Sequence, residues 1–222
     1  MVFAVKLDVD LQADVIDELK YDPEIDAEDV GVTVDNGVVT LVGTVKSFVQ
    51  YSAADRAVRR ITHVRAVAND IKVATVPGHL LNDTDIAKGI ADAFERNMLI
   101  PPETTIRVTD GGVMLKGTVA WDYQRNTAEA IARSVHGVRW VWNMITVTQP
   151  AVDAATIEGS ITGALMRSAT VDAQHIHVAV SGSHVTLTGE VHSLTERHEA
   201  GAAAWRGPGV TEITNHLRVV PG

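Results

Sequence analysis

The chain has 222 residues, a formal net charge of −9 and a pI near 5.4. This acidic balance argues against a general nucleic-acid binder, which needs a clustered basic surface, and it disfavours electrostatic attachment to anionic lipid. The chain has no cysteine, which excludes disulfides and thiolate chemistry. We find no apolar run of membrane-spanning length and no signal peptide in residues 1–8. We therefore expect a cytoplasmic protein, or a periplasmic one if a leader has been removed.

Apolar residues recur at helical spacing in three separate stretches of the chain, and each stretch predicts a helix. The first helix is expected to begin at Asp8 or Asp10, either of which is a suitable N-cap, and to end near residues 22–23. The second is expected to follow residues 82–85 and to end near residues 101–102. The third is expected to follow Asp153 and to end around Ser168.

A β-hairpin is predicted after each helix, because two-residue turn signals stand at residues 36–37, 110–111 and 182–183. Such turns fix the strand register, and a slip by one residue would expose every apolar side chain of the buried face. The predicted pairs are Val34 with Val39, Val32 with Leu41, Val108 with Val113, Ile106 with Leu115, Val180 with Val185 and Val178 with Leu187.

A second helix is predicted after each hairpin. Ser47 with Gln50 and Ser193 with Glu196 form capping boxes, and Asp122 is expected to cap the middle copy. Each helix is expected to stop where the chain turns left-handed, a conformation that favours glycine. The matching positions are His63, Gly137 and the segment 207–209, and histidine is the least favourable residue among them.

A last strand closes each copy, and a glycine and an asparagine recur in every copy at one fixed spacing. They are Gly43 with Asn69, Gly117 with Asn143 and Gly189 with Asn215. Such a repeat predicts three copies of one small unit, at residues 9–76, 82–149 and 154–221. The fold class is α+β: three tandem α-β-β-α-β units, each with two helices packed on one face of a three-stranded mixed sheet. The short connections at 74–79 and 148–152 favour docking between units.

This arrangement resembles the BON domain, named for bacterial osmotically inducible and nodulation proteins. The resemblance rests on the element order, the Gly-x-Val before the second helix and the closing Val-x-Asn-x-(Ile/Leu)-x-Val. It implies a non-enzymatic binding protein of the osmotic or envelope stress response that needs no cofactor and contacts phospholipid or another protein. One cytoplasmic relative, which pairs a BON domain with a LysM domain, binds potassium. A potassium or other small-cation sensor is therefore the alternative.

An apolar surface is predicted on the second unit. Alternation along its last strand directs Trp140, Trp142 and Met144 away from the helices, with Met114 beside them on the neighbouring strand. The equivalent positions of the other copies are mostly polar, and an exposed patch of this kind marks an interface. The interpretation that we favour is that units one and three cover the patch. The alternatives are contact with another protein, or contact with lipid or a small ligand.

Two more aromatic residues, Trp121 and Tyr123, flank the start of the second helix in the same unit. Amphipathic aromatic side chains at a helix entrance can insert at a membrane interface, so these two residues join Met114, Trp140, Trp142 and Met144 as one candidate site for a partner or lipid. Packing within the chain is the simpler interpretation, either against the same helix or between units.

The remaining polar groups have structural explanations that we favour. The three repeated asparagines are expected to tie each last strand to the glycine turn or to the first helix. His175 and His177, predicted on one strand with Glu190 opposite, could hold a transition metal, but solvated histidines explain them as well. The acidic loop at 22–29 lacks the EF-hand pattern. Since no catalytic motif is readable, we expect no enzyme.

Overall fold

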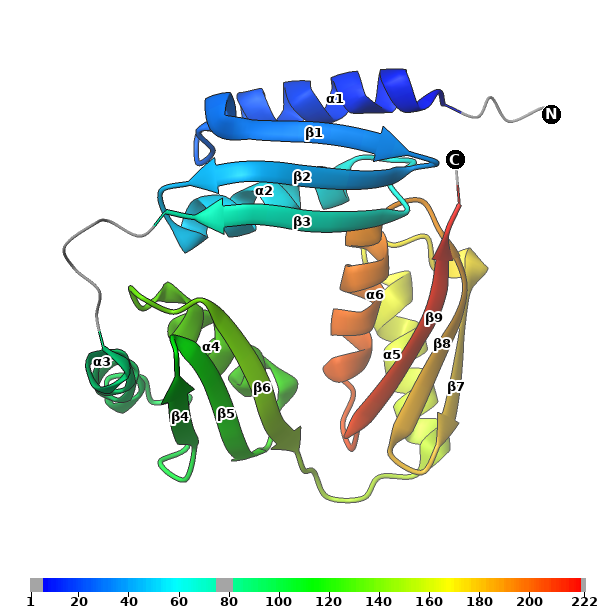
Figure 1. The fold of residues 1–222 in the computed structure, drawn as a ribbon. Helices are drawn as coiled ribbons and strands as arrows, with labels where there is room; N and C mark the ends of the chain where they lie inside the picture. Colours follow the sequence, from blue (N-terminus) through cyan, green and yellow to red (C-terminus); the bar gives the residue numbers. More distant parts are fainter. Residues whose placement is uncertain (1–5, 75–81, 221–222) are drawn as a thin grey trace.

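The protein folds into three similar units in tandem, as Figure 1 shows for the computed structural model, which describes residues 6–74 and 82–220. Each unit has the order helix, two strands, helix, strand. In each sheet the middle strand pairs antiparallel with the first strand and parallel with the last. Both helices of a unit pack on one face of its sheet. The predicted fold class is thus confirmed.

The elements follow the chain in three sets. Unit one comprises α1 (Asp8–Tyr21), η1 (Ala27–Asp29), β1 (Val30–Asp35), β2 (Val38–Val45), α2 (Phe48–Arg60) and β3 (Ala66–Val73). Unit two comprises α3 (Asp83–Glu95), β4 (Thr105–Thr109), β5 (Gly112–Val119), α4 (Asp122–Ser134) and β6 (Trp140–Val147). Unit three comprises α5 (Ala154–Met166), η2 (Ala173–His175), β7 (Ile176–Ser181), β8 (His184–Val191), α6 (Leu194–Trp205) and β9 (Glu212–Val219). Beyond Ala74, the connection predicted at 74–79 lies outside the described residues.

The hairpin register agrees with the prediction in all three units, including all six apolar pairs. The first turn has φ angles of 50° at Asn36 and 75° at Gly37, and the second has 50° at Asp110 and 73° at Gly111. Two consecutive positive φ angles are the mark of a type I′ turn, whose twist matches that of the strands.

An aspartate at the start of the first helix holds the turn in two of the three units, a contact that sequence patterns did not reveal. The Asp83 carboxylate accepts hydrogen bonds from the backbone N–H of Asp110 (2.8 Å) and of Gly111 (2.9 Å). Asp8 makes the same pair of contacts in unit one. Asp8 is therefore not the cap of α1. The N-cap position belongs to Leu7, whose side chain makes no capping hydrogen bond.

Helix α3 ends earlier than predicted, at Glu95 rather than near residues 101–102. Asn97 explains the early end, because its N–H donates to the Phe94 carbonyl (2.9 Å) and its side-chain oxygen accepts from the Leu99 N–H (3.0 Å). An asparagine side chain that bonds the backbone two residues on favours a turn over a continued helix.

The second helices start largely as expected. Ser47 and Ser193 cap α2 and α6, but the prediction for Asp122 was wrong. Trp121 occupies the N-cap position of α4, and Asp122 is the first helical residue, buried and ion-paired with Arg125. A left-handed residue follows each second helix, with φ angles of 72°, 91° and 81° at His63, Gly137 and Gly209. It lies three or four residues beyond the last helical residue, so it shapes the following loop and is not the helix stop that we predicted.

The second helices also join the three units in a closed ring. The start of each second helix contacts the end of another: α2 contacts α4, α4 contacts α6, and α6 contacts α2. The Arg133 guanidinium, late in α4, lies 5.3 Å from the centre of the Phe48 ring at the start of α2. Early in α4, Arg125 lies 4.6 Å from the centre of the Trp205 ring at the end of α6. The ring closes where the Thr195 hydroxyl, early in α6, donates to the Arg59 carbonyl late in α2 (3.0 Å). Head-to-tail contacts between repeated units form a ring when the rotation from one unit to the next closes.

Candidate functional site

The repeated glycines mark a close backbone approach in two units. A Cβ atom at Gly43 (φ 130°) would lie 1.9 Å from the Asp29 carbonyl oxygen, and one at Gly189 (φ 127°) would lie 1.9 Å from that of His175. At Gly117 (φ 155°) the nearest atom is the Thr104 Cα, at 3.2 Å. Units one and three therefore require glycine for space, whereas unit two is less constrained.

We expected the repeated asparagines to bind the glycine turn or the first helix, but this was wrong: their side chains bind the second helix. The Asn143 side-chain amide donates to the Arg125 carbonyl (2.9 Å), and the Asn215 amide donates to the Arg197 carbonyl (3.0 Å). Asn69 makes a longer contact, 3.5 Å, to the Tyr51 carbonyl. The reason is that the last strand lies beneath the second helix. In all three units, the asparagine side-chain oxygen also accepts a hydrogen bond from the backbone N–H of the residue two positions later. These contacts support a structural role.

The histidine pair of unit three is not arranged as predicted. His177 lies opposite Thr188 as expected, but His175 ends the short helix η2 and its ring Nδ1 lies 3.1 Å from the Asp172 carboxylate. The two imidazoles are thus not neighbours on one strand with Glu190 opposite. Across residues 6–74 and 82–220 we find no group of three or more potential ligands placed to hold a metal.

The tryptophan and methionine side chains of unit two lie on the open face of its sheet. We call Met114, Trp140, Trp142 and Met144 the Trp–Met face. Trp142 is 60% exposed, Met144 53% and Trp140 40%, so the favoured expectation that units one and three cover this patch was wrong. The physical reason is that the units dock through α2, α4 and α6, on the opposite face of the sheet.

The Trp–Met face is ordered by its own packing. The rings of Trp140 and Trp142 meet edge to face, with centroids 6.3 Å apart, a geometry that aromatic pairs prefer. Trp140 lies over Gly112, where a Cβ atom would come within 2.4 Å of the indole. Register places Met114 beside Trp142 on the neighbouring strand. The side chains therefore form one surface.

The charge of this sheet differs from that of the whole chain. Strands β4, β5 and β6 contain no aspartate or glutamate, whereas each of the other two sheets contains two acidic residues. Exposed Arg107 pairs in register with Met114, and exposed Lys116 pairs with Met144. The open face of unit two is thus aromatic and cationic in a protein of net charge −9.

Trp121 and Tyr123 do not belong to this surface. They are 36% and 53% exposed at the start of α4, just beyond the end of β5. Trp140 lies in register with Gly112, at the opposite end of β5. Sequence analysis grouped six residues as one candidate site, and the structure brings only four of them together.

Comparisons with known proteins give a family and one clear relative. The BON domain family model matches residues 7–75, 82–149 and 153–221. Osmotically-inducible protein Y of Escherichia coli strain K12 is 33% identical over 125 residues, which make up 54% of this chain and 62% of that protein. The match thus spans less than two thirds of the relative.

Two structures of CdsD, a structural protein of the type III secretion system of Chlamydia trachomatis, also align with the chain; the second is its C-terminal domain. The alignments cover 96% and 97% of this chain and 93% and 100% of theirs, at 15% and 16% identity. Their TM-scores are 0.28 and 0.27. A search of the helices within the described ranges found none long and apolar enough to cross a bilayer.

Proposed function

This chain belongs to the BON domain family, and from that premise we propose that it is a non-catalytic protein of the osmotic-stress type that binds phospholipid through the Trp–Met face. The stress role is inferred from the likeness to osmotically-inducible protein Y. The single observation that carries the binding role is the exposure of Trp140, Trp142 and Met144 on an open sheet face. The equivalent outward positions of units one and three hold no tryptophan or methionine.

The side chains of this face match the chemistry of a bilayer interface. An indole has a large apolar body and a polar N–H, so tryptophan is enriched where hydrocarbon meets water. Arg107 and Lys116 add cationic groups beside the methionines, and such groups attract anionic headgroups. The face would therefore bury its apolar side chains among lipid headgroups and place its cations near phosphate.

The net negative charge of the chain does not prevent this contact, because distant charges are screened. At physiological ionic strength the Debye length is about 8 Å, so a headgroup at the face responds mainly to Arg107 and Lys116. A bilayer borders both the cytoplasm and the periplasm, so the proposed contact is open to the protein in either compartment.

The test is vesicle binding by a Trp140→Ala/Trp142→Ala variant, with vesicles that contain phosphatidylglycerol. Both side chains are exposed, so the melting temperature should stay close to that of the wild type. Affinity for the vesicles should fall about tenfold or more, since each tenfold corresponds to about 1.4 kcal/mol. The matched control is Trp121→Ala/Tyr123→Ala, which removes two exposed aromatics away from the face and should retain binding.

Several results would contradict the proposal. Equal vesicle binding by the wild type and Trp140→Ala/Trp142→Ala would show that the face does not contact lipid. If the wild type does not bind vesicles but self-associates in sedimentation experiments, and the variant does not, the face is a protein interface instead. A marked fall in melting temperature with unchanged vesicle binding would show that the indoles stabilise the fold and do not contact lipid.

A small-cation sensor remains a separate prediction. Backbone carbonyls would hold such an ion, so side-chain patterns do not reveal it. A saturable, potassium-selective rise in melting temperature would support it, because a ligand that binds only the native state raises stability.

A further inference from the structure

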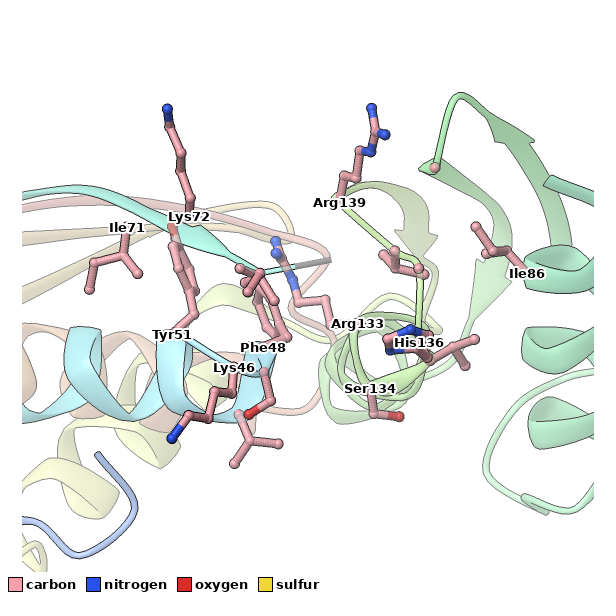
Figure 2. Close-up of a pocket in the computed structure, with 18 of the residues that line it drawn as sticks. Lys46, Phe48, Tyr51, Ile71, Lys72, Ile86, Arg133, Ser134, His136 and Arg139 are labelled. Atoms are coloured by element: carbon pink, nitrogen blue, oxygen red, sulfur yellow. The ribbon is translucent and has the colours of Figure 1, made fainter. Parts of the chain in front are cut away.

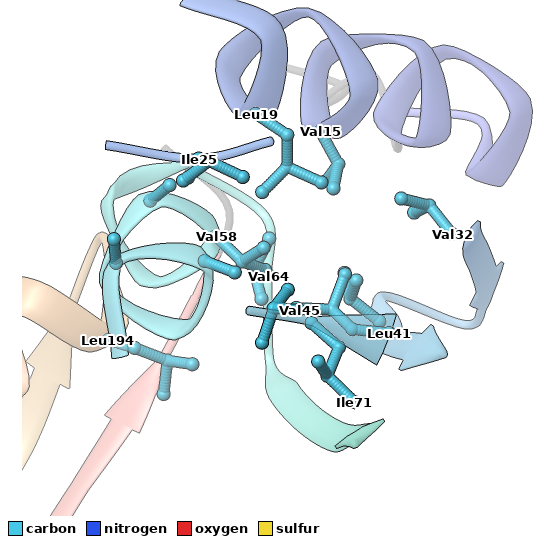
Figure 3. Close-up of a cluster of buried hydrophobic side chains, with 14 of the residues drawn as sticks. Val15, Leu19, Ile25, Val32, Leu41, Val45, Val58, Val64, Ile71 and Leu194 are labelled. Atoms are coloured by element: carbon cyan, nitrogen blue, oxygen red, sulfur yellow. The ribbon is translucent and has the colours of Figure 1, made fainter. Parts of the chain in front are cut away.

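The three junctions between units are equivalent in the ring but are filled differently. Where unit three meets unit one, Leu194 is only 7% exposed and belongs to the hydrophobic core of unit one (Figure 3). Where unit two meets unit three, Trp205 packs against both cores. Where unit one meets unit two, the contact is between half-buried Phe48 and Arg133. As far as the structure describes them, the cores of units one and two share no side chain.

A cleft of about 690 Å³ lies at this junction of units one and two (Figure 2). Its apolar part is built on Phe48 and Tyr51, whose rings stack with centroids 5.1 Å apart. The Arg133 guanidinium lies over the Phe48 ring. Burial raises the pKa of the Tyr51 hydroxyl above its ordinary value. The volume is within the range of small-molecule sites.

The lining carries more cations than carboxylates. The cations are Lys46, Lys72, Arg133 and Arg139, and the carboxylates are Asp83 and Asp110. The Asp83 carboxylate already accepts two backbone hydrogen bonds from the turn at residues 110–111, and Lys46 pairs with Asp26. Lys72 from unit one and Arg139 from unit two extend on the same side of the cleft, and Lys46 extends on the other (Figure 2). Lys72 and Arg139 both extend away from the Phe48 and Tyr51 rings, so the rim of the cleft on that side carries one cation from each unit.

We propose that this cleft binds a phosphate ester that carries an aromatic or apolar group. The phosphate lies between Lys72 and Arg139, and the attached group packs against Phe48 and Tyr51. Guanidinium and ammonium groups favour phosphate oxygens, and aromatic rings stack with bases and other flat groups. Nucleotides and phospholipids both have this chemistry. The cleft contains no residue of the Trp–Met face, so the two sites are tested separately.

Isothermal titration calorimetry of the full chain tests the proposal with three probes. They are adenosine monophosphate, short-chain phosphatidylglycerol below its micellar concentration, and inorganic phosphate. We expect saturable binding of at least one ester at millimolar or lower concentration, and weaker binding of inorganic phosphate, which lacks the apolar part. Adenosine monophosphate alone would indicate a nucleotide site, and the lipid alone a headgroup site.

Matched charge reversals locate the site. Lys72→Glu/Arg139→Glu should weaken ester binding about tenfold or more, because both cations line the cleft. Arg218→Glu/Arg65→Glu makes the same change in charge at the equivalent positions of units three and one, outside the cleft, and should leave binding unchanged. Phe48→Ala should weaken the binding of the ester and leave the binding of inorganic phosphate unchanged. All four charged residues are exposed, and melting curves verify that each variant folds.

Three results would overturn the proposal. The first is no saturable binding of either ester at millimolar concentration. The second is equal weakening by the two charge-reversal pairs, which would show that overall charge and not the cleft attracts the probe. The third is inorganic phosphate binding as tightly as the esters, which would remove the role of Phe48 and Tyr51.

Discussion

Units two and three share one fold and one hairpin register, yet equivalent residues serve different purposes in them. The open sheet face of unit three holds Glu212 and Thr214 where unit two has Trp140 and Trp142. Unit three packs side chains into both neighbouring cores, whereas unit two meets unit one across a cleft.

The difference separates the positions that make the fold from those that are free to change. Inward-facing residues of the strands and the repeated asparagine keep their contacts in all three units. The outward faces and the helix ends at the junctions differ from unit to unit. A function that is confined to one unit therefore belongs to these variable surfaces, and unit two has two of them.

The largest effect is expected at the repeated glycines. Gly43→Ala or Gly189→Ala should lower the free energy of unfolding by about 3–5 kcal/mol, because overpacking and backbone strain add together. Gly117→Ala should lower it by about 1 kcal/mol, since its Cβ meets no atom closer than 3.2 Å. Urea denaturation of the three variants measures this, and an equal loss in all three would disprove the distinction between units.

The next effect compares two equivalent junction residues, the first residue of α6 and of α2. Leu194→Ala should lower the free energy of unfolding by about 2–3 kcal/mol, because it empties a site in the core of unit one. Phe48→Ala should lower it by about 1 kcal/mol, because the variant loses one aromatic pair and one exposed cation–π contact. A larger loss from Phe48→Ala in the same denaturation series would mean that the junction of units one and two is as tightly packed as the others.

A smaller effect is expected at the aspartate that holds the turn in units one and two. Asp83→Ala leaves the N–H groups of Asp110 and Gly111 without this acceptor and should lower the free energy of unfolding by about 1–2 kcal/mol. Unit three has Ala154, which has no carboxylate, at the start of α5, so Ala154→Gly serves as a control for helix propensity alone. Thermal unfolding that is unchanged by Asp83→Ala would show that water replaces the carboxylate without loss.

The smallest effect is a gain of stability just beyond the end of α2. His63 holds a left-handed conformation that Gly137 and Gly209 hold in the other units. His63→Gly should raise the free energy of unfolding by about 0.5–1 kcal/mol, because glycine takes positive φ without steric cost. A fall in melting temperature would instead show that the imidazole makes a stabilising contact, and Gly137→His should give the opposite change in unit two.

Patterns within each copy were enough to predict the fold of a unit. Alternation of apolar residues and the turn signals at 36–37 and 110–111 set the register, since a slip by one residue would turn the buried face outward. The local errors have local causes. Asn97 ends α3 early through its side chain, and Asp8 contacts a distant turn in place of capping its own helix.

Such patterns could not predict the contacts between units. Leu194 enters the core of unit one and Trp205 lies between two cores, and no local periodicity states which side chains meet across units far apart in the chain. The same holds for the site. Alternation showed that Trp140, Trp142 and Met144 point away from the helices, but their exposure depends on where the other units dock. Because the units join through their second helices, on the opposite side of the sheets, the Trp–Met face stays open to solvent.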